Sequence, residues 1–132
     1  MKEIRHQNNI VALIHKSEDW AEGLEFLTPN ETFIQTGTWW YQKGKELKAH
    51  RHIVNKRTAE RTQETVIVLS GSMRIDFYGE NNIIFHQEVL KTSDLCIILS
   101  MGHGYVILED NTKIIEVKNG PFISVEKDKE LI

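Results

Sequence analysis

The sequence is poor in several features on which whole classes of protein depend. It has one cysteine, Cys96, among 132 residues, so it has no intramolecular disulfide, and a reducing compartment is indicated. Cys96 lies in an apolar run, where we expect a buried thiol. No apolar run approaches the ~20 residues that span a bilayer. The run at 10–14 is also too short for a signal peptide. We therefore expect a cytoplasmic protein that does not insert into a membrane.

An excess of positive charge is also missing. Sixteen lysines and arginines stand against nineteen acidic residues, which gives a net charge of −3 and no general attraction to nucleic acid or anionic membranes. The 40% of hydrophobic and 27% of charged residues are ordinary for a globular protein. No internal repeat or linker divides the chain. The composition predicts a single domain, 1–132, whose partner is a small molecule rather than nucleic acid.

No segment has a convincing helical pattern, and short strands recur along the chain. Residues 72–78 alternate, with Met73, Ile75 and Phe77 on one face. A charged tail is expected at 124–132. The predicted strands are 9–15, 31–42, 47–52, 64–70, 72–78, 83–90, 95–100, 104–109 and 113–118. Their number and the frequent turn signals predict an all-β fold, an antiparallel sandwich or barrel.

The stretch from His50 to Gly71 carries the strongest chemical signal. On a strand, His50 and His52 would point to the same side, because side chains alternate between faces. Glu64 opens the apolar run that Gly71 ends. If the two strands are neighbours, a carboxylate oxygen joins two imidazoles. Such a donor set suits zinc, iron, manganese, nickel or copper.

This stretch resembles the first motif of the cupin superfamily. Gly44 precedes His50 by five intervening residues, and Glu64 precedes Gly71 by six, as in that motif. The eleven residues between His52 and Glu64 exceed the usual gap of three or four. The resemblance implies a cupin-type double-stranded β-helix, a jelly-roll barrel. N-terminal strands would lie at 9–42 and the motif-bearing barrel at 44–120.

The second cupin motif is matched more loosely. Ser93-Asp94 stands in place of Gly-Asp, the motif's proline is missing, and the histidine, His103, comes one residue early. The resemblance implies that His103 completes a site for one divalent transition metal with His50, His52 and Glu64. Independently, a histidine between two glycines allows the backbone to come close to a site. His86 is the rival, and its strand pattern turns it to solvent.

Three further residues are candidates for substrate binding. Arg57 and Arg61 lie in the long gap and suit a carboxylate or phosphate, although a solvated loop is the alternative. Tyr105 shares a strand face with His103 and can offer a hydroxyl to the pocket.

Several functions fit these residues. One is a metal-dependent protein that acts on or binds a small anionic or sugar-like molecule. The others are a metal-independent sugar-nucleotide ketoisomerase or epimerase that uses histidine as acid or base, and a non-catalytic ligand- or carbohydrate-binding module. Whether the protein is an enzyme stays open. The apolar strand at 9–15 and the aromatic strand at 31–42 predict a homodimer, because an unpaired edge requires a cover.

Overall fold

The computed structural model describes all 132 residues, and strands dominate it. Two short helical turns complete the secondary structure, the 3-10 helix η1 (Ser17–Asp19) and α1 (Val125–Asp128). The ten strands are β1 (Lys2–His6), β2 (Asn9–His15), β3 (Gly23–Phe26), β4 (Gly37–Trp40), β5 (Glu64–Ser70), β6 (Ser72–Tyr78), β7 (Ile84–Lys91), β8 (Leu95–Ile98), β9 (Gly102–Ile107) and β10 (Lys113–Lys118).

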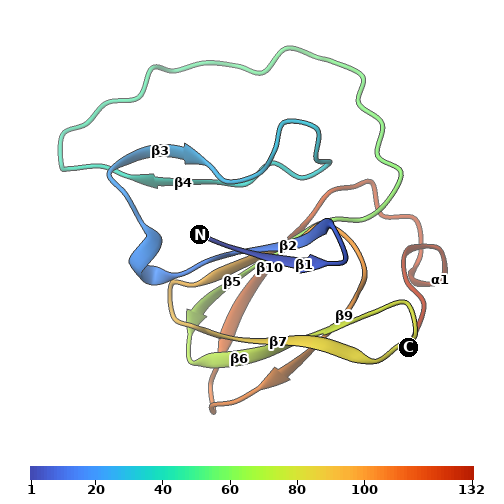
Figure 1. Ribbon diagram of the computed structural model, residues 1–132. Coiled ribbons are helices and arrows are strands. Elements are labelled where there is room, and N and C mark those ends of the chain that lie inside the picture. Colours follow the sequence, from blue (N-terminus) through green and yellow to red (C-terminus); the bar gives the residue numbers. More distant parts are fainter.

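The strands form three antiparallel sheets. The largest has the order β1-β2-β8-β5-β10, the second has the order β7-β6-β9, and β3 pairs only with β4. In Figure 1 the three-stranded sheet lies beneath the five-stranded one, and the β3–β4 ribbon lies above it. The five-stranded sheet is therefore the middle layer, and each of its faces has its own cover.

The main core fills the space between the two larger sheets. The alternating residues of β6 supply Met73, Ile75 and Phe77, each 0% exposed. Val66 and Val68 of β5 face them, together with Cys96 of β8. Burial raises the pKa of the Cys96 thiol far above its ordinary value, so this cysteine is an inert packing residue.

A smaller core lies on the opposite face of the five-stranded sheet. Leu13, Leu95 and Ile97 are covered there by Leu27 and Ile34, which follow and precede the strands of the ribbon. The ribbon itself presents an apolar outer face, made of Leu24, Phe26 and Trp39, which are 47%, 67% and 59% exposed.

The sequence predicted most of these elements. The all-β antiparallel class is confirmed, and so are the strands at 9–15, 64–70, 72–78 and 113–118, while β1 and β3 were missed. The predicted strand at 31–42 is wrong except for Gly37–Trp40, because Thr32 and Gln35 bind backbone carbonyls and turn the chain. The sheets do not form a closed barrel.

Two expectations about strand partners are also wrong. Residues 47–52 form no strand, because no neighbouring strand supplies a ladder of hydrogen bonds to them. The strand at 9–15 is not an unpaired edge, because β2 lies between β1 and β8. The homodimer stays a prediction without that argument. No helix of the structure is long and apolar enough to cross a membrane.

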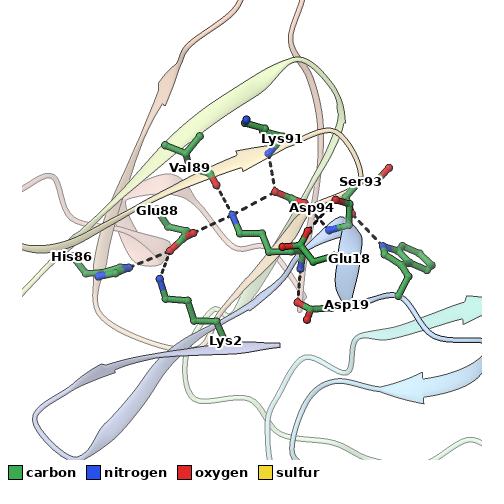
Figure 2. Close-up of polar contacts among 12 residues, drawn as sticks. Lys2, Glu18, Asp19, His86, Glu88, Val89, Lys91, Ser93 and Asp94 are labelled. Atoms are coloured by element: carbon green, nitrogen blue, oxygen red, sulfur yellow. Dashed lines mark hydrogen bonds and ion pairs between the residues drawn. The ribbon is translucent and has the colours of Figure 1, made fainter.

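A network of charges joins the first strands to β7 at one edge of the sandwich (Figure 2). Lys2 Nζ lies 2.6 Å and Lys16 Nζ 3.0 Å from the carboxylate of Glu88. Lys16 also lies 3.4 Å from Asp94, which accepts hydrogen bonds from the backbone N–H groups of Ser17 and Lys91. The network therefore ties the five-stranded sheet to the three-stranded one.

The ionisation of Glu88 depends on this network. Burial favours the neutral carboxyl, but hydrogen bonds from Lys2 and Lys16 outweigh burial and lower the pKa of Glu88 to about 2. His86, the rival metal ligand, lies beside Glu88, with 3.4 Å between His86 Nε2 and Glu88 Oε2. His86 is therefore a partner of the Glu88 carboxylate in this network.

Replacing Glu88 with glutamine should lower the melting temperature at neutral pH and have a smaller effect in acid. The folded pKa of about 2 lies below the ordinary 4.5. The ionised group therefore stabilises the fold above about pH 4.5, and this contribution is lost as the pH falls toward 2. Melting curves at several pH values check this, with the exposed Glu22→Gln as control. A difference between wild type and Glu88→Gln that stays constant with pH would contradict the assignment.

Candidate functional site

The candidate site is centred on the carboxylate of Glu64, at one end of the space between the two larger sheets. Glu64 is the first residue of β5 and is 5% exposed. Lys118, the last residue of β10, is its direct cross-strand partner. His103 and Tyr105 approach from β9 in the opposite sheet and share one face, since they are two residues apart. Three strands of two sheets therefore converge on one carboxylate.

Three donors bind this carboxylate. His103 Nε2 lies 2.8 Å and the Tyr105 hydroxyl 2.5 Å from Glu64 Oε1. Lys118 Nζ lies 2.9 Å from Glu64 Oε2 and also pairs with Glu116. The second ring nitrogen of His103, Nδ1, lies 3.3 Å from the carbonyl oxygen of Met101. Both oxygens of Glu64 are thus occupied. A neutral His103 ring has one N–H and can therefore donate to either Glu64 or Met101, but not to both.

These contacts fix the protonation states of the cluster. Burial opposes the ionisation of Glu64, but hydrogen bonds from His103, Tyr105 and Lys118 outweigh it and hold the pKa of Glu64 well below its usual range. Burial and the nearby carboxylate raise the pKa of Tyr105, so its hydroxyl keeps its proton. Burial lowers the pKa of Lys118, but bonds to Glu116 and Glu64 prevail and raise it. Glu64 is therefore an acceptor, and Tyr105 and Lys118 are donors.

The cluster lines a cavity of about 1140 Å³. One wall comes from β9, where Gly102 and Gly104 lie against Tyr78. A Cβ at Gly102 would lie 2.7 Å from the side chain of Ile132 and 3.2 Å from Cβ of Tyr78. Gly102 therefore allows this close packing, whereas a Cβ at Gly104 would make only ordinary contacts with the ring of Tyr78.

The segment 124–132, which the sequence predicts to be a charged tail, forms another wall of the cavity. Residues 127–132 all line it, and Asp128 accepts a hydrogen bond from the hydroxyl of Thr62. Charged residues of this tail thus line the site together with Leu131 and Ile132.

Gln63 and Asn119 hold the chain in place beside the cavity. The buried side chain of Gln63 accepts hydrogen bonds from the backbone N–H groups of Phe33 and Ile34, at 2.7 and 3.1 Å. It also donates to the carbonyl oxygen of Leu99 at 3.1 Å. The side chain of Asn119 accepts from the Gln63 backbone at 2.6 Å and donates to the carbonyl oxygen of Arg61 at 3.2 Å. Residues 61–63 are therefore anchored on both sides.

The other predicted site residues are placed quite differently. Figure 1 shows residues 43–60, called the arc below, running outside the sheets at the top of the view. His50, His52 and Arg57 lie on the arc and are exposed. The rings of His50 and His52 have centroids 5.3 Å apart, and His50 Nδ1 faces the carbonyl oxygen of Lys48 at 3.2 Å. Arg61, just beyond the arc, lines the cavity.

The four predicted metal ligands are therefore not brought together. No group of three or more histidine, cysteine, aspartate or glutamate side chains is arranged to hold a metal ion. The geometry explains why: His50 and His52 lie on the arc, while Glu64 gives both of its oxygens to His103, Tyr105 and Lys118. The donor set as arranged here does not fit a four-ligand metal centre. Metal binding stays a prediction of the sequence.

Sequence reasoning missed Lys118, the third partner of Glu64. The signal available was the run K-I-I-E-V-K, in which Glu116 and Lys118 share one face of a strand. The pattern marks two charged groups on the face that points toward the main core. The pattern does not predict the register between β10 and β5, which places Lys118 opposite Glu64.

Comparison of the chain with protein-family models, with curated proteins and with solved structures found no match.

Replacing Gln63 with alanine should lower the free energy of unfolding by about 2 kcal/mol or more, because two buried N–H groups and one carbonyl lose their partner. Urea titration followed by circular dichroism measures the change. Gln42→Ala is the matched control, because Gln42 is exposed, and it should stay within about 0.5 kcal/mol of wild type. Equal stability of both variants would show that Gln63 does not anchor the site.

Proposed function

We propose that the protein is a cupin-like small-molecule enzyme that performs acid–base chemistry on a polar, anionic or sugar-like substrate. The observation that carries the proposal is the 2.8 Å hydrogen bond between His103 Nε2 and Glu64 Oε1 inside a cavity. A histidine that is oriented by a buried carboxylate is a recurring device for moving protons, and imidazoles exchange protons near neutral pH.

The geometry gives each ring nitrogen of His103 a separate role. With its proton on Nε2, the ring donates to Glu64. The carbonyl oxygen of Met101 cannot donate to Nδ1, so in this tautomer the Nδ1 lone pair has no partner and becomes the base when the ring moves off that oxygen toward a substrate. When Nδ1 takes a proton from the substrate, the ring becomes an imidazolium, and the Glu64 carboxylate stabilises its positive charge. The Nδ1–H can then donate to the carbonyl oxygen of Met101, 3.3 Å away, or return the proton to the product.

The neighbouring groups support this transfer without taking part as bases. Tyr105 keeps its proton and holds Glu64, and 39% of its surface stays exposed for contact with a substrate. Lys118 balances the charge of Glu64. A carbonyl compound that loses an α-proton is isomerised when the proton returns to the neighbouring carbon. It is epimerised when the proton returns to the opposite face of the same carbon, so these two reactions fit the site best. A binding module without turnover is the competing function.

The proposal predicts that the protein speeds the exchange of α-protons of sugar phosphates and hydroxy ketones with solvent deuterium. Proton NMR in D₂O measures this for glucose 6-phosphate, fructose 6-phosphate and dihydroxyacetone. His103→Gln should slow the exchange by about a hundredfold or more, because it removes the base. Glu64→Gln should slow it as well, because an amide carries no negative charge to stabilise the imidazolium.

Controls separate this proposal from its rivals. His86→Gln should leave the exchange unchanged, because His86 lies in the network around Glu88. Binding of these compounds without any exchange would favour the binding module. The exchange is also measured after treatment with a chelator and again with added zinc or manganese. Exchange that requires the metal and is lost in His50→Ala would replace the acid–base proposal with the metal site that the cupin resemblance implies.

A further inference from the structure

A second cavity, of about 630 Å³, adjoins the first one. The two cavities have three lining residues in common, Arg61, Ser100 and Met101. Ser100 and Met101 form the turn between β8 and β9 and lie directly before Gly102, the first residue of the strand that carries His103. The two cavities are therefore neighbouring compartments that meet at this turn and at Arg61.

Arg61 has the properties of a binding group at this junction. Its guanidinium forms no ion pair and no hydrogen bond within the chain, although carboxylates line both cavities. Its backbone is fixed, because Asn119 binds its carbonyl oxygen and Gln63 anchors the residues that follow. A free guanidinium on an anchored backbone is suited to binding a carboxylate or phosphate through two hydrogen bonds.

The two compartments differ in chemistry. The first holds Glu64, His103, Tyr105 and Lys118 and suits a polar, hydroxylated group. The second is lined by the rings of His6 and Phe33 and by Glu31 and Glu80, neither of which forms an ion pair. Aromatic walls suit a planar or apolar group. The two glutamates disfavour an anion in the second compartment except beside Arg61.

We propose that the ligand has two parts joined through an anionic group. Arg61 binds the anion, the first compartment holds the reacting part at His103, and the second holds a distal part against Phe33 and His6. This inference extends the proposed function, because the first compartment is the same site. It adds a specificity subsite and limits the substrate class to compounds in which a phosphodiester or diphosphate joins two groups, because a carboxylate bears a group on one side only.

Two small probes test the arrangement by calorimetric titration. Glucose 1-phosphate should occupy the first compartment and Arg61, and phenyl phosphate should occupy the second compartment and Arg61. Each probe should displace the other, because both require the same guanidinium. Neutral glucose should bind at least about tenfold more weakly than glucose 1-phosphate, because it lacks the charge-assisted hydrogen bonds. Glucuronate in a parallel series tests whether a terminal carboxylate can replace the phosphate at Arg61.

Variants assign each probe to its compartment. Arg61→Ala should weaken both probes by about tenfold or more, and the fold should persist because Asn119 binds the backbone of residue 61 rather than its side chain. Arg57→Ala removes the same charge from the arc and should change neither affinity. Tyr105→Phe should weaken glucose 1-phosphate alone, and Phe33→Leu should weaken phenyl phosphate alone.

Three results would overturn the inference: independent binding of the two probes, unchanged affinities in Arg61→Ala, or no binding of either probe at millimolar concentration. The readout is binding and requires no turnover. Competition at Arg61 without any deuterium exchange would therefore reject the acid–base function and keep the two-part site. Deuterium exchange without competition between the probes would keep the acid–base function and reject the two-part site.

Discussion

The buried carboxylate of Glu64 imposes the main constraint on this structure. An ionised group is costly to remove from water unless partners replace the lost hydration. Here three partners do so, and they come from β9 and β10, far from Glu64 in the sequence. The carboxylate is satisfied only when the sheets pack in their native register. Folding of the sandwich and assembly of the site are therefore the same event.

The same constraint decides which groups of the cluster can give or take a proton. A carboxylate with three donors is a poor base, because protonating it would break hydrogen bonds that stabilise its charge. The phenol and the ammonium group beside it hold their protons for the complementary reason. His103 is the member of the cluster with a weakly engaged nitrogen, at 3.3 Å from a carbonyl oxygen. In the proposed acid–base function, proton transfer with a ligand is therefore assigned to this ring.

Local patterns were sufficient to predict part of this arrangement. Alternation places Met73, Ile75 and Phe77 in the core, and the spacing of His103 and Tyr105 gives them a common face. The spacing of His50 and His52 predicted that they point to the same side. That rule applies to residues two positions apart only where the backbone forms a strand. The arc has no neighbouring strand to pair with. Lys118 was missed for the opposite reason: its position depends on a register between distant segments, which no local pattern carries.

The contrast between Arg57 and Arg61 shows how backbone anchoring decides which charge is useful for binding. Both residues are exposed arginines in one long connection, and the sequence treats them alike. Binding a ligand immobilises the arginine side chain. On an unanchored segment it also immobilises several residues of backbone, and each of these residues costs about 1–2 kcal/mol of conformational entropy. Asn119 and Gln63 have already fixed the backbone around Arg61 during folding, whereas the arc around Arg57 lies outside the sheets. In the proposed two-part site, Arg61 therefore retains more of its hydrogen-bond energy as affinity, and the anchors beside it belong to that site although they need not touch the ligand.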